Sequence, residues 1–295
     1  MISFVNAKIN IGLQIVRRRE DGYHDLQTLF YPVGLKAGMP ADPVEFCDIL
    51  EICPRESGGP FTLVTTGRTV DCPVEKNLVW RAAALYMDNC CQGGFSVDIR
   101  LDKHLPDGAG MGGGSADAAF TLMMLARIER GIYGSAPSEA ELASMALRLG
   151  ADCPFFILNR PAYAEGVGER LQETGLDLSG YWLLVVKPPV SVSTREAFSG
   201  VTPREADFDL REVVSLPVEK WRGVVRNDFE ESIFPLHPCF GEIKSALYAS
   251  GALYASLTGS GSCLYGIYGD RDSAVAAEAE LKRKPTISAV YLLEL

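Results

Sequence analysis

The sequence predicts an α+β protein of two domains. Strands with a period of two residues and helices with a period near 3.6 are mixed along the chain, without the strict alternation of a doubly wound sheet. The chain has 295 residues, of which 47% are hydrophobic and 22% are charged, which is enough for full hydrophobic cores without disulfide or metal staples. We expect a domain boundary near residue 158, with domains at 1–158 and 159–295.

The balance of charges is acidic. The 28 Lys and Arg residues stand against 38 Asp and Glu residues, which gives a formal net charge of -10. General nucleic-acid binding is disfavoured, because neutralising phosphates needs a surplus of basic side chains on one face. A small anionic ligand is still compatible, since a local field of backbone N–H groups can bind one inside an acidic protein.

The chain shows no signal for membrane insertion or export. No run reaches the roughly 18 consecutive apolar residues of a membrane span, and residues 1–8 lack the basic start and apolar run of a signal peptide. The eight cysteines contain no C-x-x-C pair, which argues against a zinc site and against a disulfide framework. We therefore expect a reduced, cytoplasmic chain with no metal site of its own.

The first expected element is a strand over residues 5–15. Apolar side chains occupy every second position, and a period of two predicts a strand with one buried and one polar face. The polar positions between them include Asn6, Lys8, Asn10 and Gln14. Asp21-Gly22 then predicts a turn, and the proline-bearing segment 36–60 is expected to be loop between short strands.

Helix signals dominate the next hundred residues. Asn77 is expected to cap a helix near 78–90. Residues 95–101 alternate as a strand, and a glycine-rich segment then leads into a helix from about residue 115. Ser138 and Glu141 have the spacing of a capping box, and Gly150 is expected to end the helix that follows it.

The second half of the chain mixes both types of element again. We expect strands near 181–187 and 288–294 and helices near 238–250 and 272–284. Residues 200–220 are polar and contain prolines, which favours irregular structure there.

The glycine-rich segment is the strongest chemical signal in the sequence. Five glycines lie between Gly108 and Gly114, both included, directly before the expected helix. Glycine tolerates positive φ and lets a ligand approach main-chain N–H groups, and the helix start adds free N–H groups and a positive dipole end. The pattern predicts a cradle for nucleotide phosphates, and a flexible loop is the less favoured alternative.

Two common phosphate-binding motifs do not fit this segment. A Walker A loop needs Lys-Ser or Lys-Thr after its last glycine, where this chain has Ser115-Ala116. Gly108, Gly110 and Gly113 have the spacing of the dinucleotide fingerprint, but residues 102–106 separate them from the preceding strand, and no acidic residue closes a second strand about 20 residues on. A dinucleotide-binding oxidoreductase is therefore disfavoured.

Three other segments are candidates for function. Lys8 and Asn10 share one face of the first strand, about 6.6 Å apart, although a solvated strand face is the alternative. Asp152 follows a helix C-terminus in an apolar setting, where a carboxylate needs a partner or a function, unless it only bonds its own turn. The Gly-Ser-Gly turn at 259–261 is by itself weak evidence for a site, because such turns are common. It would have a function as a second backbone clamp that faces the glycine-rich segment.

These segments resemble the three motifs of the GHMP kinase superfamily, in the same order along the chain. The resemblance runs from about residue 5 to 268, and the D-G-Y-H run at 21–24 is its most specific part. The segments that carry it are 7–13, 18–26, 106–119, 150–156, 164–169, 226–230 and 257–263. The resemblance implies two α+β domains with the active site in the cleft between them, and transfer of the γ-phosphoryl group of ATP.

The resemblance is more specific than the superfamily, and it implies the acceptor. This acceptor is 4-diphosphocytidyl-2-C-methyl-D-erythritol, phosphorylated at its 2-hydroxyl in the non-mevalonate route to isoprenoid precursors. By the same resemblance Asp152 is the general base, and Lys8 holds that carboxylate ionised and supports the transferring phosphoryl group. The alternatives are a kinase for another small acceptor, such as homoserine or mevalonate, and a non-catalytic nucleotide-binding module.

The resemblance also implies which residues bind the substrates. Tyr23 and Phe198 would sandwich the cytosine, His24 would read its edge, and Asn10 would contact the acceptor beside Asp152. Without the resemblance, Tyr23 would be interpreted as a turn residue and Phe198 as a core residue. The ATP-binding residues are Pro106, Asp107, Gly108, Ala109, Gly110, Met111, Gly112, Gly113, Gly114, Ser115 and Ala116, with Asn77, Leu78 and Lys103 lining the adenine site.

The glycine-rich segment departs from the superfamily pattern at two positions. Ala116 stands where a second serine is common, which leaves Ser115 as the only hydroxyl there, and Met111 stands where leucine is usual. No acidic metal ligand is obvious from the sequence, so Mg²⁺ is expected to be carried by the oxygens of ATP.

Overall fold

The structure, a computed structural model, describes residues 1–34, 46–55, 59–90 and 95–295. These residues form two compact units, each assembled from separate stretches of the chain. Unit 1 comprises Met1–Ala7, Gly34–Asp107 and Gly112–Asn159, and unit 2 comprises Lys8–Val33, Gly108–Met111 and Arg160–Leu295. The predicted division into 1–158 and 159–295 cuts the chain differently, because residues 8–33 and 108–111 belong to the unit that contains the C-terminus.

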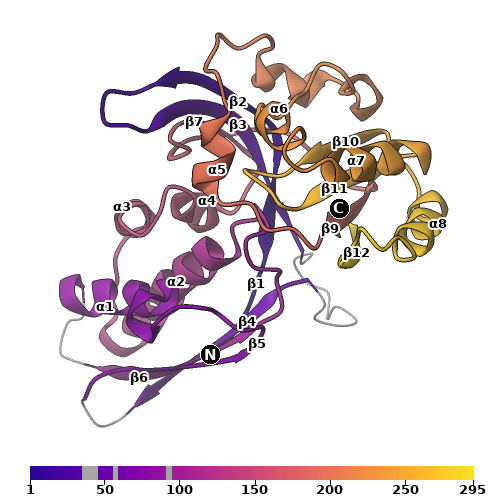
Figure 1. Ribbon diagram of the computed structural model, residues 1–295. Coiled ribbons are helices and arrows are strands. Elements are labelled where there is room, and N and C mark those ends of the chain that lie inside the picture. The colour runs from indigo at the N-terminus through magenta and orange to yellow at the C-terminus, as the bar shows by residue number, and fades with distance from the viewer. Residues whose placement is uncertain (35–45, 56–58, 91–94) are drawn as a thin grey trace. The chain divides into compact units, whose positions relative to one another are not determined.

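Unit 1 is built on a four-stranded sheet with helices packed against it (Figure 1). Its strands, in spatial order, are β1 (Ile2–Val5), β4 (Asp48–Arg55), β6 (Ser96–Lys103) and β5 (Thr62–Gly67), and only the β5–β6 pair is parallel. Its helices are α1 (Leu78–Asn89), α2 (Gly113–Tyr133), α3 (Glu139–Leu147) and α4 (Cys153–Leu158), after a 3-10 turn at Val74–Lys76. Helix α2 packs on β4 and β1 and also contacts the other three helices.

The helices of unit 1 begin largely where local signals predict. Asn77 caps α1 by accepting a hydrogen bond from the N–H of Val79 at 2.9 Å. Ser138 and Glu141 form the predicted capping box at the start of α3, with bonds of 3.3 Å and 2.8 Å. Helix α3 ends at Leu147, earlier than the predicted end at Gly150.

Unit 2 contains two four-stranded sheets. The first has the order β2 (Ala7–Arg18), β3 (His24–Val33), β7 (Ala162–Gly166) and β8 (Arg170–Glu173). The second is antiparallel, with the order β10 (Tyr254–Leu257), β11 (Leu264–Tyr268), β9 (Trp182–Lys187) and β12 (Ala289–Glu294). Its helices are α5 (Thr194–Ser199), α6 (Phe229–Ile233), α7 (Cys239–Ala249) and α8 (Arg271–Leu281), with 3-10 turns at Leu210–Ser215 and Val218–Lys220. The strands and helices predicted for the second half of the chain are confirmed.

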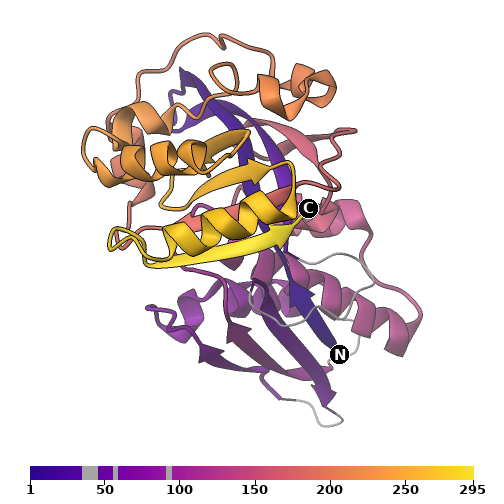
Figure 2. The same cartoon turned by 90° about the vertical axis from the view of Figure 1, so that its right-hand side faces the viewer.

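Helices α7 and α8 cover the second sheet of unit 2, and Figure 2 shows α8 lying along it. Phe240 and Leu247 of α7 share one buried cluster with Leu281 of α8. Leu184 of β9 and Leu264 of β11 complete this core from the sheet. The apolar face of each helix is therefore buried against the sheet.

Strand β2 is buried on both faces from Ala7 to Ile15, so the alternative of a solvated polar face is wrong. Lys8 is 3% exposed and Asn10 is 2% exposed. The neighbouring apolar residues of the strand, Ile9 and Ile11, are fully buried. A period of two separates two kinds of face, but it does not reveal whether the rest of the chain covers the polar one. Buried polar groups need partners, and those of Lys8 and Asn10 belong to the candidate site.

The expected loop at 36–60 also needs correction. Residues 48–55 form β4, which pairs with both β1 and β6. Residues 35–45 and 56–58 of this segment lie outside the described residues. Within the described ranges no helix combines the length and the apolar character needed to cross a membrane.

A buried cluster of three charged residues joins the sheet of unit 1 to α2. Lys103 donates to Asp48 and, at 2.7 Å, to Oδ2 of Asp117. Asp48 also accepts from two backbone N–H groups, whereas Oδ1 of Asp117 has no hydrogen-bond partner among the described residues. Burial raises the pKa of Asp117 to about 7, against the opposing effect of the Lys103 ammonium.

This shift predicts a pH-dependent contribution of Asp117 to stability. The pKa of Asp117 is higher in the folded protein than in the unfolded chain, where it is about 3.9. The folded state therefore binds more protons, and stability from this group falls as the pH rises from about 4 to about 7. We expect the free energy of unfolding of the wild type to fall relative to that of Asp117→Asn over this range, as measured by urea unfolding at several pH values.

Asp272→Asn provides the control, because Asp272 is an exposed residue in the first turn of α8. Its unfolding free energy should follow the wild type across the same pH range. Parallel curves for the wild type and Asp117→Asn would mean that Asp117 does not titrate between these limits.

Candidate functional site

The glycine-rich segment has the backbone conformation of an anion-binding nest. Gly108, Gly110 and Gly112 have φ angles of 58°, 72° and 71°, and the residues between them do not have positive φ. Such alternation turns successive N–H groups toward one side of the chain. Helix α2 begins at Gly113, so its first N–H groups also lack partners within the helix.

The carbonyl groups of this segment are held by other parts of unit 2. Ser262 N–H donates to Gly108 at 3.1 Å, Cys263 N–H to Ala109 at 3.1 Å, the Thr258 hydroxyl to Gly110 at 3.2 Å, and Lys8 N–H to Met111 at 3.0 Å. In the described part of the chain, the N–H groups of residues 109–112 donate no hydrogen bond. The loop is thus fixed through its carbonyls and presents its donors, which suits a phosphate group.

The Gly-Ser-Gly turn faces this loop, as predicted. A Cβ atom on Gly110 would lie 2.1 Å from the carbonyl oxygen of Thr258, and one on Gly259 would lie 2.8 Å from the carbonyl oxygen of Gly110. Both backbones approach so closely that neither position has room for a side chain. The prediction that the turn lies against the loop is confirmed, and a role of the two backbones in holding a ligand stays a prediction.

Lys8 and Asn10 form a buried pair on β2, as their shared face predicts. The Lys8 ammonium donates to Oδ1 of Asn10 at 2.5 Å and lies 4.8 Å from the centre of the Phe30 ring. The Asn10 amide donates to the Thr28 hydroxyl at 3.0 Å. A buried ammonium in a low dielectric attracts an anion more strongly than an exposed one does.

The backbone of Asn10 fixes this pair to the turn. Its N–H donates to the Thr258 hydroxyl at 3.1 Å, and its carbonyl accepts from the Tyr265 hydroxyl at 2.8 Å. Thr258 therefore contacts both β2 and Gly110 with one hydroxyl. Lys8, Asn10 and residues 108–111 form one hydrogen-bonded assembly within unit 2.

Unit 1 holds the other predicted catalytic residue. Asp152 lies between α3 and α4, at the N-terminal end of α4, and its side chain does not cap that helix. The expectation that a helix C-terminus disfavours its charge is therefore corrected, because α3 already ends at Leu147 and Asp152 directly precedes α4, whose N-terminal end favours a carboxylate. Gly150, two residues earlier, would bring a Cβ within 4.0 Å of the Ser115 hydroxyl, so this turn lies against the first turn of α2.

Cys153 follows Asp152 and is fully buried. Burial raises the pKa of its thiol to about 11, with a smaller contribution from the Asp152 carboxylate. The thiol is therefore neutral at physiological pH and is not suited to nucleophilic chemistry. Of the two neighbours, only Asp152 carries a group that could accept a proton.

The predicted adenine-site residues lie around the start of α2 in unit 1. Leu78 Cδ1 is 3.5 Å from the Cβ position of Gly114, and the Lys103 ammonium is 3.6 Å from that of Gly113. The side chain of Asn77 caps α1, and the Lys103 ammonium is paired with two carboxylates. Ala116 is fully buried behind Ser115. Their contacts to a nucleotide stay predictions.

The predicted cytosine-binding residues are only partly brought together. The His24 ring stacks on Phe198, with centroids 4.8 Å apart and planes at 18°, and Phe229 meets the same ring edge-on. Tyr23 is 66% exposed, so His24 rather than Tyr23 covers Phe198 here. Burial, with a smaller effect of the charge on Arg18, lowers the pKa of His24 below its usual value. The imidazole is therefore neutral near pH 7 and offers one donor and one acceptor.

Sequence reasoning did not identify Thr258 or Asn227 as parts of the site. Asn227 is 2% exposed, and its amide donates to the carbonyls of Leu257 and Gly259, at 2.9 Å each. The only sequence signal for these two residues was that segments 226–230 and 257–263 are among those that resemble the superfamily. No pattern along the chain shows that a single amide reaches a turn 30 residues later.

Among the described residues, no group of three or more His, Cys, Asp or Glu side chains could hold a metal ion. The nest, in contrast, offers free donors and no negative charge, which fits the phosphates of a nucleotide.

Comparison with known proteins agrees with this geometry. Residues 77–160 match the GHMP kinases N terminal domain family, and residues 218–286 match the GHMP kinases C terminal family. A 4-diphosphocytidyl-2-C-methyl-D-erythritol kinase of Bacteroides thetaiotaomicron is 45% identical over 271 residues, which is 91% of this chain and 92% of the relative. A kinase of the same name from Bacteroides fragilis is 42% identical over 294 residues, covering 96% of this chain and 100% of the relative.

Solved structures give the same result. A crystal structure of 4-(cytidine 5'-diphospho)-2C-methyl-D-erythritol kinase matches with a TM-score of 0.79 and 33% identity, over 99% of this chain and 98% of that one. A homoserine kinase from Cytophaga hutchinsonii matches with a TM-score of 0.67 but only 16% identity, over 99% and 95% of the two chains, so it shows the fold alone. The chain belongs to the 4-diphosphocytidyl-2-C-methyl-D-erythritol kinase family of the GHMP kinases.

Proposed function

We propose that this protein phosphorylates the 2-hydroxyl of 4-diphosphocytidyl-2-C-methyl-D-erythritol with ATP, giving the 2-phosphate and ADP in the non-mevalonate route to isoprenoid precursors. The observation that carries the proposal is the 45% identity to a kinase of that name over 91% of the chain. The clamped glycine nest supports it independently, because a kinase must hold the phosphates of its nucleotide.

The nucleotide binds along the glycine-rich segment. The free N–H groups of residues 109–112 contact its phosphates, with Ser115 as the neighbouring hydroxyl. Asn77, Leu78 and Lys103 line the adenine site, and Mg²⁺ enters on the oxygens of the nucleotide. In this proposal residues 1–158 supply the ATP-binding domain and 159–295 the acceptor-binding domain, although residues 8–33 and 108–111 belong to the same compact unit as residues 160–295.

Asp152 is the general base of the proposed reaction. The acceptor oxygen forms a bond to the γ-phosphorus, the bond from that phosphorus to the ADP oxygen breaks, and the hydroxyl proton passes to Asp152. Lys8 supplies the positive charge that stabilises the transferring phosphoryl group. Asn10, which already holds the Lys8 ammonium, contacts the acceptor beside the base.

Tyr23, His24 and Phe198 select the cytidyl end of the acceptor, with the base taking the place that the His24 ring occupies on Phe198 in the structure. An aromatic pair binds either face of a base, and a neutral imidazole can read its edge with one donor and one acceptor. Because Tyr23 is exposed, it can cover a base without leaving a core. Both substrates are water-soluble nucleotides, so we expect the protein to act in the cytoplasm.

An activity assay tests the proposal directly. Purified protein with ATP, Mg²⁺ and 4-diphosphocytidyl-2-C-methyl-D-erythritol should form equal amounts of ADP and a 2-phosphorylated product. Homoserine and mevalonate serve as alternative acceptors and should give no product above background. Phosphorylation of either alternative, or ADP formation that does not depend on any acceptor, would contradict the proposed substrate.

Replacing the proposed base should abolish turnover without abolishing binding. Asp152→Asn keeps the shape of the side chain but removes the proton acceptor, so we expect kcat to fall by about 10²–10⁴-fold with ATP affinity little changed. Asp272→Asn, on the exposed start of α8, is the matched control and should keep the wild-type rate. A near-normal kcat for Asp152→Asn would exclude Asp152 as the base.

Removing the proposed aromatic pair should affect one substrate selectively. Tyr23→Ala and Phe198→Ala should each raise KM for the cytidyl acceptor by about 5–150-fold, the loss expected for about 1–3 kcal/mol of stacking, and change KM for ATP much less. Tyr133→Ala removes another exposed tyrosine, from α2, and should change neither KM. Equal changes in both KM values would count against the sandwich.

A further inference from the structure

The nest depends on a turn that is itself held from elsewhere in unit 2. Thr258 and Gly259 contact Gly110 so closely that a displacement of the turn must displace the loop. The turn is closed by backbone hydrogen bonds from Thr258 N–H to Cys263 and from Gly261 N–H to Thr258, both at 3.0 Å, but these bonds do not by themselves fix its distance from Gly110. The position of the phosphate-binding donors is therefore set by whatever anchors residues 257–259.

Asn227 is one anchor of this turn, beside Glu230, whose carboxylate accepts from the N–H of Leu257 at 2.9 Å. Both hydrogens of the Asn227 amide are used, one on the carbonyl of Leu257 and one on that of Gly259, each at 2.9 Å. These two carbonyls flank Thr258, the residue that contacts Gly110. The amide oxygen accepts from the N–H of Phe229 at 3.0 Å, so the amide plane cannot rotate without losing three bonds.

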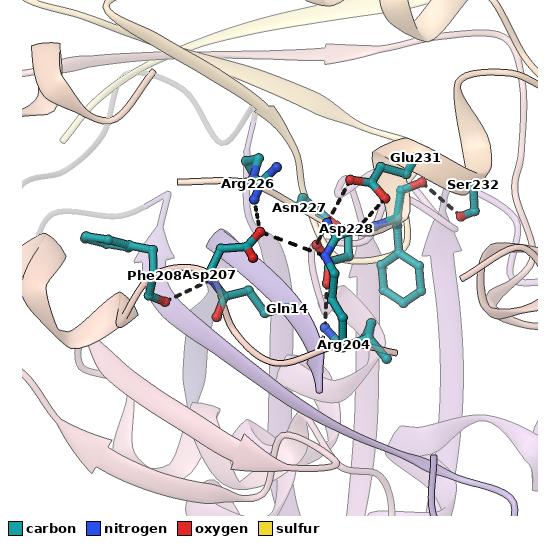
Figure 3. Close-up of polar contacts among 11 residues, drawn as sticks. Gln14, Arg204, Asp207, Phe208, Arg226, Asn227, Asp228, Glu231 and Ser232 are labelled. Carbon is teal, nitrogen blue, oxygen red and sulfur yellow. Dashed lines mark hydrogen bonds and ion pairs between the residues drawn. The ribbon is translucent and has the colours of Figure 1, made fainter. Parts of the chain in front are cut away.

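The segment that carries Asn227 is fixed to β2 on both sides. Leu13 exchanges backbone hydrogen bonds of 2.9 Å and 2.8 Å with Arg226 and Asp228. Asp228 also accepts from the N–H of Ile15 at 2.8 Å. Arg204 then pairs with Asp228 at 3.2 Å and with Glu231 at 2.7 Å, as Figure 3 shows. The anchor of the turn is therefore braced on the same strand that carries Lys8 and Asn10.

We propose that Asn227 is a positioning residue for nucleotide binding. By holding both carbonyls beside Thr258, it sets the distance between the turn and Gly110, and so aims the N–H groups of residues 109–112 at the nucleotide phosphates. This inference rests on the proposed function of the loop. Asn227 touches no substrate; it acts through the turn and the loop.

Asn227→Ala separates this role from a merely structural one. We expect the Kd for ADP, measured by titration calorimetry, to rise by at least about tenfold, because two bonds that fix the turn are lost. KM for ATP should rise in parallel, while KM for the cytidyl acceptor should change by less than about threefold. Asn227→Asp places carboxylate oxygens, which cannot donate, opposite the carbonyls of Leu257 and Gly259. This variant should weaken ADP binding at least as much as Asn227→Ala does.

Ser232→Ala is the matched control. Ser232 is also a buried polar residue, on the adjoining α6, and its hydroxyl contacts the carbonyls of Ala197 and Phe229 at 2.9 Å and 3.0 Å. Its loss should lower Tm by a comparable amount and leave the Kd for ADP within about twofold of the wild type. Equal Kd values for Asn227→Ala and Ser232→Ala, at similar Tm, would overturn the inference.

A double variant tests whether the effect passes through Thr258. Thr258→Val removes the hydroxyl that contacts Gly110 and Asn10. If Asn227 acts through this residue, the Kd of the double variant should stay close to that of the weaker-binding single variant, whereas independent effects would multiply. Multiplied effects would overturn the proposed route.

Two further outcomes separate this inference from the proposed function. Wild-type protein that binds no adenine nucleotide would overturn both. Wild-type binding with an unchanged Kd in Asn227→Ala would overturn the inference alone. Should Asn227→Ala fail to fold, Asn227→Ser keeps one donor toward the turn and should show a smaller rise in the same Kd.

Discussion

The hydrogen-bonded seam between residues 108–111 and the turn at 258–263 is the constraint on which the site in unit 2 depends. Four successive carbonyls of the loop are satisfied by protein donors, so its N–H groups are left facing away. A loop of glycines has a high conformational entropy, and a ligand would otherwise have to order it on binding. Because the seam orders the loop during folding, its N–H donors are already arranged before a ligand binds.

The same seam explains why β2 is polar on a buried face. Lys8 and Asn10 each use the backbone for the seam and the side chain for one another. A buried lysine is costly unless its surroundings satisfy it, and here an amide and an aromatic ring do so in part. A cationic group is thereby kept inside the protein at the strand that supports the loop.

Local patterns predicted what local forces decide. The caps at Asn77 and Ser138 and the strand period of residues 5–15 need only neighbouring residues. The structure confirms both caps and the strand from Ala7 onward, whereas Val5 ends β1, which belongs to another sheet. The burial of the polar face of β2 and the anchoring by Asn227 depend on residues distant in sequence. A single sequence without structure gives no distance between such residues, which is why the backbone conformation of the loop was predictable and its support was not.

The seam also joins stretches that lie far apart in the polypeptide. Residues 8–15 are synthesised before their partners at 226–228 and 258–265. Contacts of such long sequence separation form late, because the intervening chain must be closed first. On the ribosome, the glycine loop therefore gains its supporting contacts only after residues 258–263 have emerged.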